Sequence, residues 1–392
     1  MSTSRRLDIR SEFLPFHRPA IGEAEIAAVT EVLRSGWLTT GARARALEAA
    51  FAGQLGLEPA AAAAVSSCTA ALHLGLRLLE VGPGDEVLLP TTTFAATANV
   101  VVHLGARPVF CDIDPRTQCL DPRDLAARVT PRSRAVVPVH LGGHPCDMTA
   151  IGEVATRHGL AVLEDAAHAI ETVWGGQRAG TLGDAGAFSF YATKAITTGE
   201  GGMLVSRRPE LVDAARILAL HGLSRDAWRR YDREGDAHYE VVDAGYKYNL
   251  PDVLAAIGLV QLEKLHELWG ARRVLVERYV DVLDGLPVTW QPTEIPGGRH
   301  AHHLFLLGLR PEAPLARDAL AVALRERQIG TSIHFRPLHL QPFYRETCGC
   351  RAGDLPVAEA VYGASLSLPL FPDMTVGDVD YVAGHLRDLL GA

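Results

Sequence analysis

The chain has 392 residues, of which 48% are apolar and 21% are charged, so it is long enough for two or three globular domains. Its net charge of −8 leaves no basic footprint for nucleic acid, and no apolar run approaches membrane-spanning length. The N-terminus has no apolar run like that of a secretory signal. The six cysteines lack CxxC spacing, so we expect no metal site and a reduced, cytoplasmic protein.

Strands and helices are predicted to alternate along the first 220 residues. Two helices, over 19–36 and 42–55, come first, and apolar and amphipathic runs then follow one another. Strands are predicted at 61–65, 86–89, 108–111, 135–139, 160–164, 187–191 and 203–206, with helices at 70–79, 92–104, 122–129, 148–158 and 210–221. This order predicts an α/β fold in which helices cover both faces of a mainly parallel sheet.

The C-terminal part has a different pattern. A polar stretch over 224–241 is predicted to be an excursion from the core, and one long helix is predicted over 252–283. Strands near 304–309 and 331–335, with two or three helices, suit a smaller α+β domain. We therefore expect a large domain over 1–250, and a linking helix with a small domain over 251–392.

Lys194 is one of only three lysines among 38 basic residues, the others being Lys247 and Lys264. Lys264 lies in an amphipathic helix and is most simply a solvated charge. Lys194 instead follows a buried apolar run, where desolvation lowers the pKa of an ammonium and makes the amine a nucleophile for a carbonyl cofactor. An ion-paired lysine at a strand end is the alternative, and from this residue alone the two readings are even.

Three loops follow predicted strands, at the sheet edge where open α/β folds bind ligands. In one loop, Asp165 needs a cationic partner, which is a protonated pyridine nitrogen or an arginine, and His168 is either a ring contact or a core histidine. In another, Cys68 and Thr69 open a helix that either binds an anion or is capped by its own side chains.

Several other residues are candidates for a substrate site. Phe94 could stack on a flat cofactor, although an aromatic residue at a helix start is usually in the core. Trp37 plugs the core or lines a pocket mouth. Four C-terminal residues, among which an arginine suits a diphosphate, gather in one segment that could equally be solvated surface: His334, Arg336, His339 and Tyr344.

Taken together, these segments resemble the DegT/StrS family of sugar aminotransferases, and the resemblance runs over nearly the whole chain. The matching motifs are SGWLTTG (35–41), SSCTAALHLGL (66–76), GDEVLLPTTTFAATAN (84–99), EDAAHA (164–169), GDAGAFSF (183–190), GEGGM (199–203), GYKYNL (245–250) and SLPLFPDM (367–374). The motifs at 245–250 and 330–339 most resemble the branch that aminates the 4-ketone of UDP-4-keto-arabinose.

The resemblance implies a fold-type I enzyme dependent on pyridoxal 5'-phosphate (PLP), with a mixed, mostly parallel seven-stranded sheet. Lys194 would form the Schiff base and move the proton, and Asp165 would hold the pyridinium nitrogen. The implied cofactor-binding residues are Cys68, Thr69, Phe94, Asp165, His168, Ser189, Lys194 and, from the neighbouring subunit, Asn249. The implied substrate-binding residues are Trp37, Thr39, His334, Arg336, His339 and Tyr344.

The function that follows is amination of the C4 ketone of a nucleotide-linked keto sugar, such as dTDP-4-keto-6-deoxyglucose or a UDP-4-keto sugar, with glutamate as donor. The protein is expected to be a homodimer whose active sites are shared between subunits. Phe94 replaces a tryptophan of the arabinose branch, and Cys68 stands where glycine or alanine is common. The alternatives are a C3 keto-sugar or cyclitol aminotransferase and a non-catalytic regulatory protein on the same fold.

Overall fold

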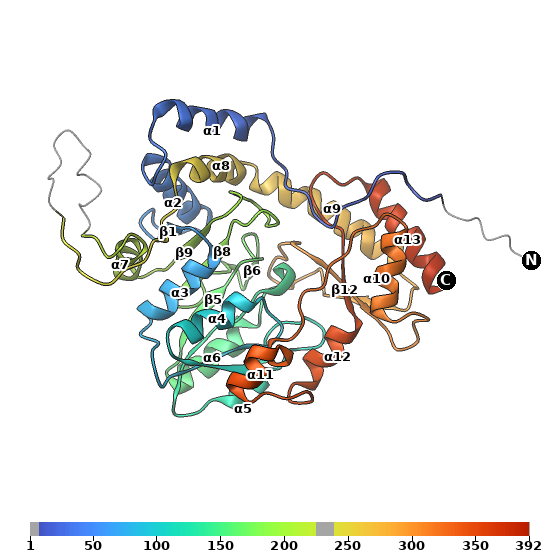
Figure 1. Ribbon diagram of the computed structural model, residues 1–392. Coiled ribbons are helices and arrows are strands. Elements are labelled where there is room, and N and C mark those ends of the chain that lie inside the picture. The colour runs from blue at the N-terminus through green and yellow to red at the C-terminus, as the bar shows by residue number, and fades with distance from the viewer. Residues whose placement is uncertain (1–7, 225–238, 392) are drawn as a thin grey trace, which may run out of the picture.

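A seven-stranded sheet with the order β1-β9-β8-β5-β4-β2-β3 organises the protein, which a computed structural model describes over residues 8–224 and 239–391 (Figure 1). The strands are β1 (Ala62–Val65), β2 (Glu86–Pro90), β3 (Arg107–Cys111), β4 (Ser133–Val136), β5 (Ala161–Asp165), β8 (Ala185–Ser189) and β9 (Gly202–Val205). From β8 to β3 the neighbours pair in parallel, whereas β9 pairs antiparallel with both β1 and β8. The sheet is therefore mixed, with β9 reversed.

Helices cover both faces of this sheet because its strand residues alternate between two cores. In β1, Ala63 and Val65 join the core under α3, α4 and α7, whereas Ala62 and Ala64 face α2 and α8. Toward β3 the second face is covered by α5 and α6. These helices are α2 (Ala42–Gln54), α3 (Cys68–Leu78), α4 (Ala95–His103), α5 (Pro122–Arg128), α6 (Met148–His158), α7 (Pro209–Ala219) and α8 (Asp252–Glu263). Near α6 the chain also forms the small hairpin β6 (Val173–Trp174) and β7 (Gln177–Arg178).

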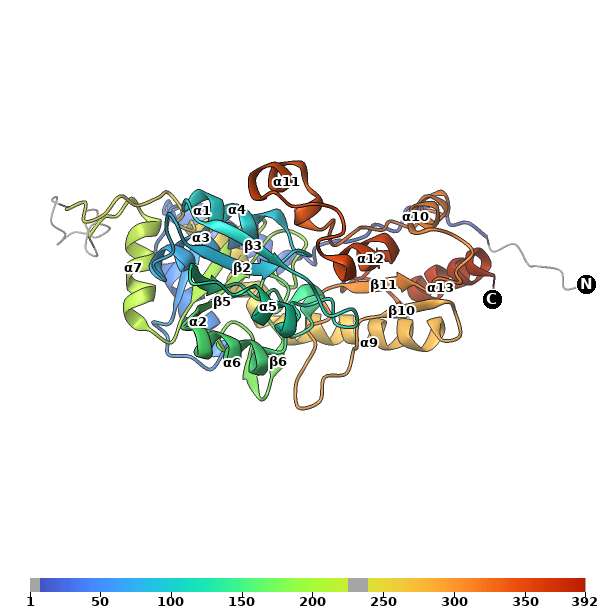
Figure 2. The same cartoon turned by 90° about the horizontal axis from the view of Figure 1, so that it is seen from below.

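A second, antiparallel sheet has the order β10-β11-β12, and α9 runs along it (Figure 2). Its own apolar core includes side chains of α9, α10 and α13 and also Leu14 from the N-terminal segment. The elements are β10 (Val288–Trp290), β11 (Phe305–Leu309), β12 (Ser365–Leu368), α9 (Leu265–Leu283), α10 (Arg317–Glu326) and α13 (Val376–Leu390).

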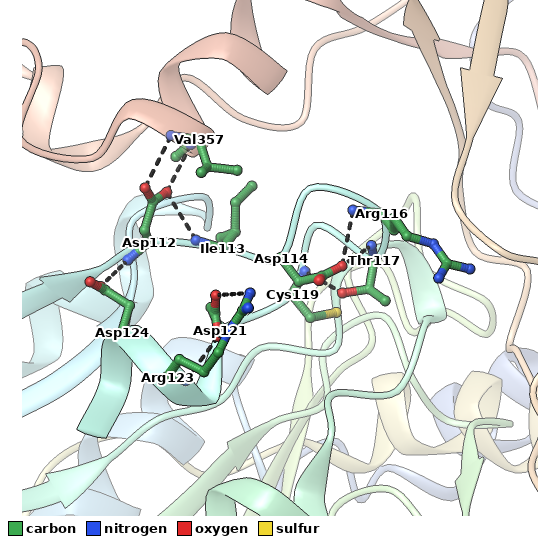
Figure 3. Close-up of polar contacts among 11 residues, drawn as sticks. Asp112, Ile113, Asp114, Arg116, Thr117, Cys119, Asp121, Arg123, Asp124 and Val357 are labelled. Carbon is green, nitrogen blue, oxygen red and sulfur yellow. Dashed lines mark hydrogen bonds and ion pairs between the residues drawn. The ribbon is translucent and has the colours of Figure 1, made fainter. Parts of the chain in front are cut away.

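Two C-terminal helices, α11 (Pro342–Cys348) and α12 (Pro356–Ala364), pack against the core of the large sheet. The Asp112 carboxylate, just after β3, accepts hydrogen bonds from the first N–H groups of α12, at Val357 (3.0 Å) and Ala358 (2.8 Å) (Figure 3). Residues after 250 thus pack in the core of the large sheet, and Leu14 packs in the core of the small sheet. The division of the chain into two domains at residue 250 stays a prediction.

The prediction of one long helix over 252–283 is wrong, because the helix is interrupted at Lys264, which separates α8 from α9. Lys264 is also not a simple solvated charge. Its amine lies 2.8 Å from the carboxylate of Glu25, which is buried in α1 (Glu23–Ser35). This ion pair and the packing of α1 on α8 hold the N-terminal helix α1 against the junction of α8 and α9 (Figure 1).

Two further expectations need correction. No strand forms over 331–335, because only Ser332 pairs with β12, through Ser367, and the following residues turn into the cavity described below. The helix predicted over 92–104 begins later, at Ala95, with Phe94 as its N-cap. Most of the predicted polar excursion, 225–238, lies outside the described residues.

Candidate active site

A cavity of about 570 Å³ opens where β5 and β8 end and α3 begins. The connections at these strand ends supply most of its wall, and segments 332–335 and 303–304 close it from the side of the small sheet. Its lining includes eight of the predicted site residues: Cys68, Thr69, Phe94, Asp165, His168, Ser189, Lys194 and His334.

Asp165, the last residue of β5, is buried and faces this cavity. One carboxylate oxygen accepts a hydrogen bond from the Thr97 hydroxyl (2.8 Å) and the other from the Ala167 N–H (3.1 Å). Burial raises the pKa of Asp165, against the opposing effect of these donors and of Lys194. The arginine partner considered as an alternative does not occur among the described residues, so the carboxylate keeps acceptor capacity for a cation in the cavity.

Lys194 projects from the loop after β8 into the same cavity. Desolvation lowers the pKa of its amine to about 8, even though Cys68 and Asp165 act in the opposite direction. The amine is therefore partly unprotonated near neutral pH, which is the form that attacks a carbonyl. It forms no ion pair with a described carboxylate, so the reading as an ion-paired strand-end lysine loses its support.

His168 is held in one tautomer. The backbone N–H of Gly142 donates to its Nδ1 (3.2 Å), and burial keeps the pKa of the ring well below its usual range. A neutral imidazole whose Nδ1 accepts must carry its proton on Nε2. His168 can therefore donate a hydrogen bond to an oxygen in the cavity.

The start of α3 forms an anion cradle beside Lys194. Ser67 caps the helix by accepting from the Ala70 N–H (3.1 Å), and the first residues of the helix, Cys68 and Thr69, line the cavity. The free N–H groups of a helix start suit an anion. A side chain on Gly202 of β9 would collide with the backbone of Ser67 and Cys68, so this glycine is what lets strand and helix meet. Thr69 and Ser189 add hydroxyls to the cradle wall.

These residues fit PLP by the chemistry of their groups. The α3 cradle suits its phosphate, Asp165 suits a protonated ring nitrogen, His168 suits the ring oxygen and Lys194 suits the aldehyde carbon. When bound, PLP supplies the electron sink that stabilises a carbanion at the carbon bearing the amine. The chain's own part would be to hold the Asp165 carboxylate beside the ring and to move a proton with the Lys194 amine. Phe94 and Phe335, whose ring centroids are 6.0 Å apart, cover the cavity.

Three predicted residues lie together, outside the cavity wall of their own chain. Asn249 donates from its amide to the Thr40 hydroxyl (2.7 Å), and the Thr39 carbonyl accepts from the Asp252 N–H (3.2 Å). Trp37 precedes them in the same loop and is 36% exposed. That Asn249 serves the neighbouring subunit stays a prediction.

The remaining predicted substrate residues are not brought to the cavity. His339 is buried, with Nδ1 at 2.8 Å from the Thr91 hydroxyl and Nε2 at 2.9 Å from the Glu359 carboxylate. The Tyr344 hydroxyl donates to the Asn99 side chain, and Arg336 is bonded to the Leu340 carbonyl. His339 and Tyr344 instead pack α11 and α12 onto α4 and β2. That these three side chains contact the sugar stays a prediction.

Sequence reasoning missed several residues of the wall. Thr97 of α4 donates to Asp165 and also pairs with Thr93 (2.8 Å), which lies just before that helix begins. His17 and His303 also line the cavity. The density of histidines over 300–303 was a signal for His303 alone.

Within the described part of the chain, no group of three or more His, Cys, Asp or Glu side chains is arranged to hold a metal ion. In the same residues, every helix is too short or too polar to cross a membrane.

Comparison with known proteins identifies the family of this chain. The model of the DegT/DnrJ/EryC1/StrS aminotransferase family matches residues 19–387. The spore coat polysaccharide biosynthesis protein SpsC of Bacillus subtilis is 48% identical over 383 residues, covering 97% of this chain and 98% of SpsC.

Solved structures are similar over the same length. The aminotransferase TlmJ of Streptoalloteichus hindustanus has a TM-score of 0.89 at 39% identity, covering 97% of this chain and 99% of that one. The putative sugar aminotransferase Spr1654 of Streptococcus pneumoniae has a TM-score of 0.90 at 30% identity in its PLP form, covering 97% and 99%, and it is also known in a pyridoxamine phosphate form. The chain therefore has the fold-type I architecture and belongs to the DegT/DnrJ/EryC1/StrS family, as a PLP-dependent sugar aminotransferase.

Proposed function

We propose that the enzyme transfers an amino group from glutamate to the C4 ketone of a keto sugar linked to a nucleoside diphosphate. The observation that carries this proposal is the single cavity in which Lys194 and Asp165 converge. Its volume of about 570 Å³ is in the range of small-molecule sites. Its lining combines the cofactor residues with His334 and Phe335, which we expect to face the sugar ring.

Support for position C4 comes from sequence. Segments 245–250 and 330–339 resemble the branch that acts on UDP-4-keto-arabinose, and His334 of the second segment reaches the cavity wall. Its Nδ1 is bonded to the Ser367 hydroxyl (2.7 Å), which leaves Nε2 for a sugar hydroxyl. The role of SpsC in spore coat polysaccharide biosynthesis supports a sugar acceptor as well.

We further propose a homodimer. The solvent face of α1 exposes Ile26 and Leu33, and the loop after it exposes Leu38, each close to half exposed or more. A second copy covering this face would bring the Trp37, Thr39 and Asn249 cluster to the partner's cavity. A cytoplasmic location is supported by the cysteines, all six of which are free and lie in the described residues.

The decisive experiment offers glutamate and a panel of dTDP- and UDP-linked 3-keto and 4-keto sugars to the holoenzyme, with product NMR as readout. A new amine at C4 is the expected result, and an amine at C3 or on a cyclitol would refute the assigned position. Borohydride reduction followed by peptide mapping is expected to place the pyridoxyl label on Lys194. Label on Lys247 would refute the assignment of the lysine.

A further inference from the structure

The side chain of His303 is buried and has an unpartnered ring nitrogen. Only 5% of it is exposed, it lines the cavity, and its Nδ1 has no partner among the described residues. Its ring centroid lies 4.4 Å from that of His168, so it stands next to the cofactor residues. A buried polar nitrogen without a partner costs free energy unless a ligand satisfies it.

His17 is the second cavity histidine of this kind. Its Nε2 is buried and has no partner, whereas the other ring nitrogen is hydrogen-bonded to the Ala192 carbonyl. A neutral ring that donates from Nδ1 has a bare lone pair on Nε2. His17 must therefore take up a proton before Nε2 can donate to a ligand.

Positive charge surrounds this pair of histidines. Burial, Arg272 and Lys194 lower the pKa of His17 to about 4, and burial, His168, Lys194, Arg272 and His17 itself lower that of His303. Arg272 is fully buried, its Nε has no partner, and its described contacts are the carbonyls of Ala195 (3.3 Å) and Leu268 (3.4 Å). A buried guanidinium that forms no ion pair with a described residue leaves a positive potential, which an anion in the cavity would neutralise.

We propose that this His17–His303 corner binds a carboxylate of the amino-acid donor, and that the carboxylate enters together with a proton. The inference rests on the proposed function, since it assigns the binding site of the amino-acid donor within that same cavity. The balance is simple: a carboxylate anion and one proton from solvent enter, and an imidazolium–carboxylate pair results with no covalent change.

Geometry favours the donor over the other anion of the reaction, the diphosphate of the nucleotide sugar. In an amino acid, the α-carboxylate carbon lies only about 2.5 Å from the amine nitrogen that reacts. It must therefore sit deep in the cavity, near Lys194 and His168, where His303 is. The diphosphate is separated from the reacting C4 by the whole sugar ring, which places it farther out.

The test is isothermal titration of the holoenzyme with glutarate, a dicarboxylate without an amine, at pH 7 in two buffers of different ionisation enthalpy. Net proton uptake is expected for the wild type. His17→Asn and His303→Gln are each expected to weaken glutarate binding by ~10-fold or more, the range for hydrogen bonds to a charged group. His17→Asn is also expected to abolish the proton uptake.

His302→Gln is the matched control. His302 is the neighbouring residue, and it is buried with an unpartnered Nδ1 but does not line the cavity, so glutarate binding is expected to stay at the wild-type level. PLP content and circular dichroism check that every variant is folded and loaded.

Titration with UDP separates the two anions. Unchanged UDP affinity in His17→Asn and His303→Gln supports the donor assignment, whereas loss of UDP affinity with intact glutarate binding would assign the corner to the diphosphate and overturn it. Unchanged glutarate binding in both variants would also overturn it. Failure of the proposed function looks different, because no amino acid would then change the visible spectrum of the wild-type enzyme.

Discussion

Glu164 and Asp165 are consecutive carboxylates on β5, yet the protein treats them in opposite ways. Glu164 is completely buried and accepts four hydrogen bonds, from the backbone N–H groups of residues 180, 182 and 183 and from His140 (2.9 Å). Asp165 accepts only two. Because successive residues of a strand face opposite sides, one carboxylate enters the packed side of the sheet and the other the cavity.

The difference shows how structural and functional polar groups can be told apart. The His140 ring is also fully engaged, since its Nδ1 accepts from the Cys146 N–H (3.0 Å) while Nε2 holds the proton toward Glu164. In the cavity, by contrast, Asp165, Lys194 and His303 keep unused capacity. Polar groups that the fold satisfies stabilise it, and unsatisfied polar groups that also face a cavity are candidates for binding a ligand.

The largest effect is expected from Lys194→Arg on the cavity side. The charge is kept, but arginine cannot lose its proton, so both covalent attachment of PLP and proton transfer are lost. Transamination should fall by ~10²–10⁴-fold from the acid–base role alone. Measurement is by the glutamate-dependent spectral change in single turnover, and a variant within a few-fold of wild type would contradict the role of the lysine.

Asp165→Asn is expected to lower kcat by ~10²–10³-fold, the range for removing one preorganised electrostatic group. The amide cannot stabilise a protonated ring nitrogen. Folding should change little, because the amide carbonyl can accept from the Ala167 N–H while the Thr97 hydroxyl reverses and accepts from the amide NH2 group. Steady-state kinetics and thermal unfolding check the two parts. A variant with low stability and normal kcat would mean that Asp165, like Glu164, serves the fold and not catalysis.

Glu164→Gln is the matched variant on the packed side. The glutamine NH2 group cannot accept, so at least one buried donor loses its partner, at a cost of about 1–3 kcal/mol of unfolding free energy. The kcat of the folded, PLP-loaded fraction should stay near the wild-type value. Denaturant unfolding measures the free energy of unfolding, and kinetics on the same preparation measure kcat. A large loss of kcat without loss of stability would contradict the contrast between Glu164 and Asp165.

The pH dependence of cofactor capture sharpens the same point. The pKa of Lys194 in the protein without bound cofactor is lowered to about 8, so the nucleophilic amine fraction rises about tenfold per pH unit below that value and levels off above it. The rate of PLP capture by the apoenzyme, followed by absorbance from pH 6 to 9.5, should show this bend. A bend near the ordinary lysine value of 10.5 would mean that desolvation is not what activates the amine.

The smallest effect is expected from Tyr344→Phe, which removes a bond between α11 and α4 outside the cavity. Stability should fall by about 0.5–1.5 kcal/mol, the net value of one hydrogen bond. KM for the sugar should not change. A markedly raised KM with wild-type stability would mean that Tyr344 contacts the sugar substrate.

Much of this protein could be predicted from its sequence. The alternation of apolar and amphipathic runs predicted the strands and helices of the large sheet, because periodicities of 2 and 3.6 residues are local properties. The rarity of lysine and the acidic pair after an apolar strand pointed to Lys194 and Asp165, since the strand ends that carry them meet at one edge of the sheet.

Tertiary structure decided what depends on packing between distant segments. The reversal of β9 was invisible because a strand pattern reads the same in both directions. Of the C-terminal histidines, His334 and His303, which sequence reasoning missed, line the cavity. Both ring nitrogens of His339 instead form hydrogen bonds, with Thr91 and Glu359. Which side chains remain unsatisfied is set by neighbours far along the chain, and spacing within a segment carries no record of them.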